Sequence, residues 1–266
     1  MSFPLFQVDA FTHLPFSGNP AAVCLLSAPQ KTDWMQAVAA EMNLSETAFL
    51  YPSPAGETHH LRWFTPVTEV DLCGHATLAS AHVLWEEKQV DAGIPIRFET
   101  RSGVLRADKK GKRIAIDFPA ETEAAADAPP DLLAALGLEA VYVGKTSVDY
   151  LVEVENESML RAVTPDFRRL KKVLTRGVMV TARASCSDYD FVSRFFAPAA
   201  GIDEDPVTGS AHCVLGPYWE KRIGKKELKA YQASLRGGVL KVRCAGERVC
   251  LEGEAVTVLR GSLLYI

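Results

Sequence analysis

The sequence predicts an α+β fold made of two pseudo-symmetric lobes, each a curved mixed sheet around one central helix. The main observation is an internal repeat: residues 62–85 read RWFTPVTEVDLCGHATLASAHVLW, and residues 194–219 read RFFAPAAGIDEDPVTGSAHCVLGPYW. Copies about 130 residues apart are too widely spaced for a solenoid, whose period is roughly 20–50 residues. Short strand patterns surround both copies, and each copy ends in an apolar segment long enough for a buried helix. The chain therefore contains two homologous lobes.

The first lobe, predicted to span residues 1–118, begins with the alternating strand pattern Phe6-x-Val8-x-Ala10. A helix is predicted from Thr32 or Asp33 to Met42, with Asn43 ending it in a left-handed turn. The segment 76–87 is apolar nearly all round and predicts the buried central helix. Further strands are predicted at 21–26, 48–51, 61–64, 95–99, 103–107 and 113–118.

The second lobe, predicted at 130–255, follows a linker at 119–131 that is rich in Pro, Ala and acidic residues. Its central helix follows Gly209, and Pro217 predicts a kink in it. Two more helices are predicted at 131–136 and 165–174, and strands at 140–143, 149–154, 177–182, 238–243, 248–252 and 255–259. The C-terminal strand, 256–266, is a candidate to cross back and complete the first lobe, which leaves the active cleft between the lobes.

Composition sets limits on partners and location. The net charge is −4, and the densest basic run, RRLKK at 168–172, is typical of a solvated helix face, so we expect no nucleic-acid partner. No apolar run approaches the roughly 20 residues that cross a bilayer, and no signal peptide is evident. The six cysteines form no Cys-x-x-Cys pair and are interpreted as reduced thiols. We expect a cytoplasmic protein without a membrane partner.

A glycine stands directly before each predicted central helix: Gly74 in the first copy and Gly209 in the second. A glycine there either simply turns the chain or lets backbone N–H groups approach a ligand at the positive end of the helix dipole. Each glycine is followed by a functional side chain, His75 or Ser210. The duplication favours a binding site for a carboxylate at the paired helix ends.

Polar side chains near these glycines are the candidate catalytic groups. His75 is either a satisfied helix-end residue or an acid or hydrogen-bond donor, and its match to Ser210 favours the second interpretation. Asp205 is either part of an Asp-Pro turn or a catalytic group, and its place five residues before Ser210 favours catalysis. Glu46 is either the third residue of a capping box or a carboxylate base at a strand start. No room for a helix remains between Glu46 and Pro52, which favours the strand start. The spacing alone leaves the role of Glu46 as a base open.

Thiol and metal chemistry receive little support from the sequence. A cofactor-free racemase with two opposed thiols could use Cys73, but the matching position in the second copy is Thr208. His82 and His212 do not have the spacing of paired ligands on one helix turn, and the acidic run at 203–205 does not fit a calcium loop, so we expect no metal. Neither a phosphate-binding loop nor a dinucleotide fingerprint is present, and no cofactor is expected.

Motifs throughout both lobes resemble those of the phenazine-biosynthesis PhzF-like isomerase family, which shares the fold of diaminopimelate epimerase. The matching segments are DAFT at 9–12, GNPAAV at 18–23, LSETAF at 44–49, RWFTPVTEVDLCGHATLA at 62–79, EDPVTGSAH at 204–212 and PYW at 217–219. The resemblance implies a cofactor-independent isomerase or epimerase that shifts a proton on a small carboxylate-bearing metabolite. It leaves open whether the product is an epimer or a double-bond isomer.

The resemblance also implies roles for individual residues. Glu46 would be the general base, and His75, Asp205 and Ser210 would bind and polarise the substrate and assist proton transfer. The implied substrate contacts are Asn19, Cys73, Gly74, Thr208 and Gly209. A homodimer is implied as well. Two alternatives stay open: a metabolite- or protein-binding module that retains the cleft without catalysis, and a racemase that uses Cys73.

Overall fold

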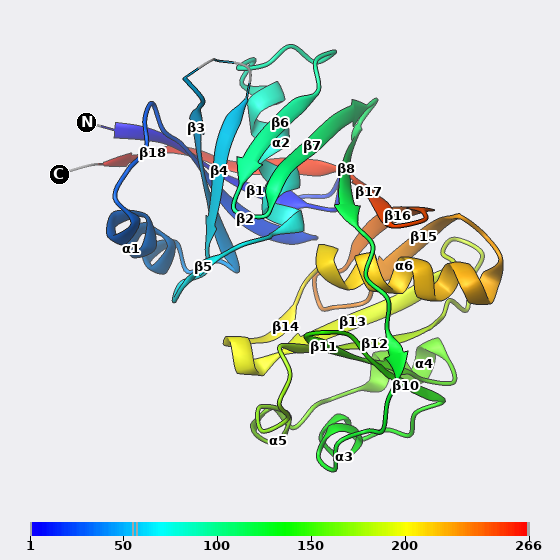
Figure 1. Ribbon diagram of the computed structural model, residues 1–266. Coiled ribbons are helices and arrows are strands. Elements are labelled where there is room, and N and C mark those ends of the chain that lie inside the picture. Colours follow the sequence, from blue (N-terminus) through cyan, green and yellow to red (C-terminus); the bar gives the residue numbers. More distant parts are fainter. Residues whose placement is uncertain (1, 55, 57, 265–266) are drawn as a thin grey trace. The chain divides into compact units, whose positions relative to one another are not determined.

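The computed structural model describes residues 2–54, 56 and 58–264, which form two compact units (Figure 1). Unit 1 consists of Met1–Phe118 together with Cys250–Ile266, and unit 2 is Pro119–Val249. The α+β class is confirmed, since each unit combines a mixed sheet with one long buried helix. Among the described residues, no helix is both long enough and apolar enough to cross a membrane.

Unit 1 is a mixed sheet with helices α1 (Thr32–Met42) and α2 (Gly74–Glu86). Its strands are β1 (Ser2–Ala10), β2 (Asn19–Leu25), β3 (Glu46–Pro52), β4 (His59–Phe64), β5 (Glu69–Val70), β6 (Ile96–Thr100), β7 (Gly103–Lys110), β8 (Arg113–Pro119) and β18 (Ala255–Leu264). Strand β18 pairs antiparallel with β1, so the end of the chain joins the first unit; its predicted last residues, 265–266, lie outside the described residues. From β1 the pairing continues through β2, β3, β4, β6 and β7 to β8, and the β2–β3 and β4–β6 pairs are parallel.

Two apolar regions stabilise unit 1. Helix α1 packs on a cluster that includes Phe3, Phe49 and Phe64, whose rings make edge-on contacts with each other or with Trp34. Helix α2 contacts β1, β2, β3 and β18, and ten of its 13 residues are buried. Its apolar sequence has no polar stripe because it is enclosed. Asn43 ends α1 with φ 50° in the left-handed region, as the sequence predicted.

Unit 2 repeats this connectivity. Its strands are β9 (Ala124–Ala125), β10 (Tyr142–Lys145), β11 (Asp149–Glu153), β12 (Gly177–Arg183), β13 (Phe191–Ala197), β14 (Ile202–Asp205), β15 (Glu227–Gln232), β16 (Gly238–Ala245) and the first part of β17 (Arg248–Gly253). The parallel pairs β11–β12 and β13–β15 correspond to β2–β3 and β4–β6, and antiparallel β12–β13 corresponds to β3–β4. The buried helix α6 (Gly209–Ile223) takes the place of α2.

The structure differs from the local expectations in two respects. The helix predicted at 165–174 is wrong in extent, because α5 (Phe167–Leu170) has four residues; beyond it the backbone N–H of Arg176 donates to the Val148 carbonyl at 2.9 Å and directs the chain into β12. Helix α4 (Glu157–Ala162), capped by Asn156, and strands β13, β14 and β15 were not predicted. Helix α6 contains Pro217 and continues to Ile223, and the kink at Pro217 stays a prediction.

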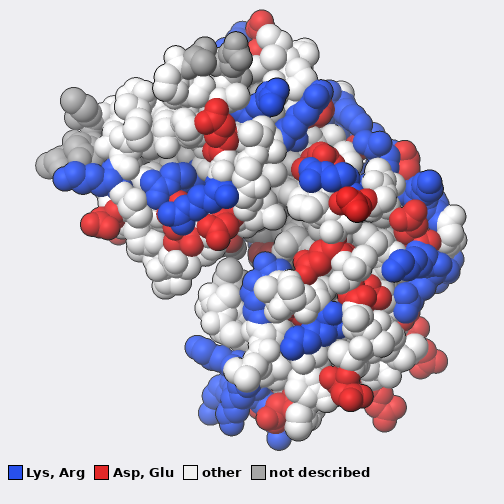
Figure 2. All heavy atoms as spheres, viewed as in Figure 1, with Lys and Arg blue, Asp and Glu red and all other residues white. Residues whose placement is uncertain are grey.

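The segment 119–131 is not a free linker. Its residue Ala120 donates a backbone hydrogen bond to Glu247, and Glu121 donates one to Cys213. Its strand β9 pairs with β10, and the short helix α3 (Leu132–Leu136) follows. On the face shown in Figure 2, Lys and Arg are interspersed with Asp and Glu. The run at 168–172 exposes all four of its basic side chains, consistent with a solvated surface.

Candidate functional site

The predicted site residues of unit 1 gather where β2, β3 and α2 begin, and we call Asn19, Glu46, Cys73 and His75 the His75 cluster. Asn19 is the first residue of β2 and Glu46 the first of β3. Because β2 and β3 are parallel, with Ala21 opposite Glu46, both side chains lie at the same sheet edge. Glu46 therefore opens a strand, and the capping-box interpretation is wrong.

His75 lies at the centre of this cluster. Its Nδ1 is 3.2 Å from Nδ2 of Asn19 and 3.5 Å from Sγ of Cys73, and its Nε2 is 3.3 Å from a carboxylate oxygen of Glu46. The amide Nδ2 of Asn19 is a donor, so Nδ1 accepts and the ring proton belongs on Nε2, facing Glu46. Burial lowers the pKa of His75 to about 3. The ring is thus a neutral Nε2–H donor at neutral pH.

The position of Nε2 matters for chemistry. Among the described residues, Nε2 of His75 makes no well-aligned hydrogen bond, although the Glu46 oxygen lies within ion-pair distance. The side chain of Glu46 is 15% exposed, whereas that of His75 is 5% exposed. A base and a neutral donor therefore lie side by side, with the base reachable from solvent.

The same three side chains, Glu46, Cys73 and His75, place one ligand atom each within 4.8 Å of one another. This geometry could accept a metal ion. However, Nδ1 of His75 already faces the amide donor of Asn19, which competes with metal coordination at that atom. The cluster fits proton transfer at least as well as it fits a cation.

In unit 2 the predicted residues gather at the start of α6, and we call Asp205, Thr208, Ser210 and Gln232 the Ser210 cluster. The hydroxyl of Thr208 donates to Asp205 at 2.6 Å, and its backbone N–H donates to the Gln232 side chain at 2.8 Å. Gln232 in turn donates to the Asp205 carbonyl at 2.7 Å. Asp205 and Thr208 are thus held in a buried network.

His212 also belongs to the structure of this turn. Its Nδ1 donates to the Thr208 carbonyl at 2.8 Å, and its ring stacks on Phe191. Burial lowers its pKa to about 4, and the hydrogen bond to the Thr208 carbonyl opposes that shift. His212 is therefore a neutral side chain that fixes the N-terminus of α6 from inside.

Both helix ends are left open by their cap residues. Cys73 and Thr208 are extended, and neither caps its helix with a side-chain hydrogen bond. The first intrahelical bonds run from Thr77 to Cys73 and from His212 to Thr208. The preceding N–H groups, which include those of Gly74 and Gly209, have no intrahelical acceptor and carry the positive end of each helix dipole.

The sequence did not identify three side chains that the structure places here. Gln232 comes from β15, which was not predicted. Arg176 and Asp149 form a salt bridge at the starts of β12 and β11, and Arg176 also donates to the Ser210 hydroxyl at 3.3 Å. A topological alignment of the lobes could have found Asp149, because it starts β11 as Asn19 starts β2.

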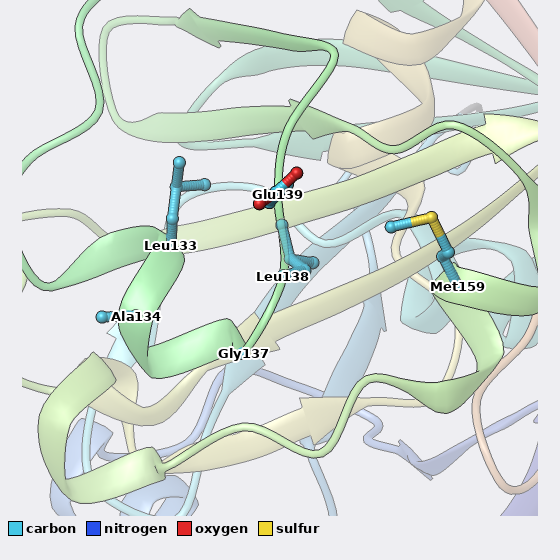
Figure 3. A pocket seen from close by; sticks show the side chains of 6 residues that line it. All are labelled: Leu133, Ala134, Gly137, Leu138, Glu139 and Met159. Atoms are coloured by element: carbon cyan, nitrogen blue, oxygen red, sulfur yellow. The ribbon is translucent and has the colours of Figure 1, made fainter.

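A surface pocket lies on unit 2 beside α3, away from the Ser210 cluster (Figure 3). It has a volume of about 470 Å³ and is lined by Leu133, Ala134, Gly137, Leu138, Glu139 and Met159. None of the predicted site residues lines it. It offers a single carboxylate and no donor set, so we assign it no catalytic role.

Comparison with known proteins agrees with this picture. Residues 8–261 match the family model described as phenazine biosynthesis-like protein. An uncharacterized isomerase of Halalkalibacterium halodurans is 54% identical over 99% of both chains. A crystal structure of a PhzF-family phenazine biosynthesis protein of Enterococcus faecalis superposes with a TM-score of 0.94 at 42% identity, covering 100% of both chains.

A more distant likeness concerns the fold alone. A probable proline racemase of Agrobacterium radiobacter has a TM-score of 0.68 at 11% identity, over 98% of this chain and 93% of that one. The two-unit α+β architecture is therefore shared with racemase- and epimerase-like proteins. Together with the match over nearly the whole sequence, these findings show that the chain belongs to the phenazine biosynthesis-like (PhzF) family, an isomerase-like family.

Proposed function

We propose that this protein is a cofactor-independent isomerase that shifts a proton on a small carboxylate-bearing metabolite, with Glu46 as the general base. The observation that carries the proposal is the Glu46 carboxylate, which lies 3.3 Å from Nε2 of a buried, neutral imidazole at the start of α2. A base and a donor at this separation suit removal of a proton from carbon. The names of the relatives, isomerase among them, support the class of reaction.

The first step is removal of a proton from a carbon next to a carboxylate, carbonyl or enamine. The C–H bond breaks, its proton goes to Glu46, and its electron pair delocalises onto the adjacent group. The Nε2–H of His75 can donate to the oxygen on which the negative charge develops. A preorganised donor of this kind typically contributes about 3 kcal/mol to the stability of the transition state.

The helix ends supply further donors. The first N–H groups of α2 and α6, which have no acceptor within their own helix, suit a carboxylate or an enolate-like oxygen. The proposal requires the His75 and Ser210 clusters to act on one substrate. The internal repeat supports this requirement, because it gives both units the same hairpin followed by an open helix end.

The second step returns the proton to a different carbon, or to the other face of the same carbon. Either outcome balances without an oxidant or reductant. Glu46–H, assisted by His75, is the proton source in our proposal, while Asp205 and Ser210 hold the substrate. Water exclusion during this interval favours return of the proton to the substrate over loss to solvent.

Deuterium uptake tests the proposal. The protein is incubated in heavy water with a small-metabolite extract and with candidate amino and hydroxy acids, beside a Glu46→Gln variant and a Glu41→Gln control on the exposed face of α1. We expect a metabolite that gains deuterium or changes to an isomer with the wild type and with Glu41→Gln, but not with Glu46→Gln.

Product isomers are read in the same samples, because fully internal proton return leaves no deuterium. If neither deuterium nor an isomer depends on Glu46, the protein is better described as a metabolite- or protein-binding module. The homodimer and the cytoplasmic location stay predictions. Light scattering over a range of concentrations tests the first, and cell fractionation tests the second.

A further inference from the structure

Arg176, next to the Ser210 cluster, is fixed in place by a buried carboxylate. Its Nε donates to Oδ1 of Asp149 at 2.9 Å, and its Nη2 donates to Oδ2 of the same residue. Asp149 is 1% exposed, and the backbone N–H of Arg176 donates to the Val148 carbonyl at 2.9 Å. The side chain and the backbone are thus anchored to the same turn, which orients the guanidinium before any ligand arrives.

The guanidinium has a second edge, and that edge faces the helix end. Nη2 also donates to Oγ of Ser210 at 3.3 Å, at the second residue of the 15-residue helix α6. Since Oγ accepts this bond, its own proton is free to donate to another partner. Among the described residues, Nη1 makes no hydrogen bond, and the side chain of Arg176 is 44% exposed.

The donors on this side therefore point to one kind of ligand. An Nη1–H of Arg176 and the neighbouring Ser210 O–H can each donate to one of the two oxygens of a carboxylate. The Ser210 hydroxyl and the open N–H groups at the start of α6 are of the same character. The Asp149 carboxylate takes the Nε–H and one Nη2–H, and Ser210 takes the other Nη2–H, so among the described residues both N–H groups of Nη1 stay accessible.

We propose that Arg176 is a specificity-determining residue that binds a carboxylate of the substrate through its Nη1 group, together with the Ser210 hydroxyl. This inference rests on the proposed function for its substrate, and it adds that unit 2 anchors the carboxylate while the His75 cluster moves the proton. Asp149 is the positioning residue that holds the guanidinium.

Neighbouring charges refine the choice of anion. Asp149, Asp205 and Glu121 all act electrostatically on Arg176. Three carboxylates outnumber the single guanidinium, so the surroundings carry no excess positive charge and repel a doubly charged anion more strongly than a singly charged one. The site should therefore prefer a singly charged carboxylate to phosphate.

The test uses the full-length protein labelled with ¹⁵N and follows the Nε–Hε signal of Arg176, which is assigned by its absence in Arg176→Lys. Sodium propionate, propionamide and inorganic phosphate are titrated at matched ionic strength. We expect a saturable shift with propionate, none with propionamide, and at least about 10-fold weaker binding of phosphate. Asp149→Asn should weaken propionate binding by about 10- to 100-fold.

Arg168→Lys, an exposed arginine of α5 in the same unit, is the matched control and should leave propionate binding unchanged. Once deuterium uptake has identified a substrate, Arg176→Lys should raise KM about 10- to 100-fold with a smaller change in kcat. A structural ion pair alone would change stability and leave KM unaffected.

The outcomes separate this inference from the proposed function. A propionate shift at Arg176 without any Glu46-dependent turnover would keep the anchor and refute the isomerase. Turnover with an unchanged KM in Arg176→Lys, or equal shifts with propionate and propionamide, would refute the anchor and keep the isomerase. A shift reproduced by sodium chloride would also refute the anchor, because it would show general charge screening.

Discussion

The two helix ends share a scaffold and differ in what they present. In unit 1, Arg62 forms a bidentate pair with Glu69 and lies over the Phe64 ring; in unit 2, Arg194 does the same with Glu204 and Phe196. Each pair braces a hairpin, β4–β5 or β13–β14, that leads into the buried helix. The Arg–Glu pair is therefore common to both copies of the repeat, whereas the side chains at the N-terminus of the buried helix differ between them.

The N-terminal ends of α2 and α6 differ in charge and in the type of hydrogen-bond donor that they present. Unit 1 presents a neutral imidazole beside a carboxylate, a pair suited to moving a proton. Unit 2 presents a hydroxyl beside a guanidinium, a pair suited to holding an anion. The comparison suggests a division of work between the two copies, which the following experiments test.

The largest expected effect on activity is the contrast between a variant of the proton donor, His75, and a variant of the anion-binding residue, Ser210. His75→Asn should lower the rate of the substrate exchange identified above by about 10²- to 10⁴-fold, mainly in kcat, because a neutral acid is lost. Ser210→Ala should lower kcat/KM by about 10- to 100-fold, mainly through KM. Steady-state kinetics on both variants checks this, and equal kcat losses would contradict the division.

The second effect concerns the two braces. Glu69 binds Arg101 as well as Arg62, so Glu69→Gln removes a charged partner from two arginines and should cost about 3 kcal/mol of unfolding free energy, although Arg62 keeps Thr32 and Arg101 keeps Asp71 as partners. Arg194 keeps its hydrogen bond to the Val163 carbonyl, so Glu204→Gln should cost about 2 kcal/mol. Urea unfolding measures both, and the reverse order would contradict this account.

The third effect is pH dependence, with one buried histidine in each unit. Burial lowers the pKa of His75 to about 3 and that of His212 to about 4, from 6.5. The unfolded chain binds protons that the native state does not, so stability is fully present above pH 6.5 and falls as the pH drops toward 4. Each histidine contributes a slope of up to about 1.4 kcal/mol per pH unit.

Replacing either histidine should make the stability of its own unit less dependent on pH. Hydrogen exchange of β2 amides should become less sensitive to pH in His75→Asn, and that of β12 amides in His212→Asn. Unchanged slopes in both variants would show that these rings are protonated in the native state.

The smallest expected effect concerns the thiol. Cys73 is 7% exposed, and the matching Thr208 donates its proton to Asp205 and offers no second thiol. Cys73→Ala should therefore lower activity by less than about 10-fold, the value of one weak hydrogen bond. Abolition of activity by this substitution, or by a thiol-alkylating reagent, would favour the thiol racemase over the Glu46 mechanism.

The repeat made much of the architecture predictable. Two copies of one motif predicted two lobes, and the apolar runs after Gly74 and Gly209 predicted both buried helices. The same motif pointed to His75 and Ser210. Pro52 already favoured a strand start at Glu46, and the structure confirms it, but the nearness of Glu46 to His75 depends on tertiary contacts that no local pattern shows.

Other features depend on contacts between distant parts of the sequence. Asp149 lies 27 positions before Arg176, and Arg176 lies 34 before Ser210, so no local pattern links them. The helix predicted at 165–174 failed because its composition favours a helix, while the Arg176 hydrogen bond to Val148 imposes a turn. Tertiary contacts overrode local propensity there.

The pairing of β18 with β1 has a consequence for the order of biosynthesis. Ribosomes add the 119–249 segment in full before they make the strand that closes the first sheet. Nascent chains therefore present β1 with an uncovered edge while unit 2 can already fold. Premature termination anywhere upstream of residue 255 would release a polypeptide with that edge permanently open, and such a product should aggregate.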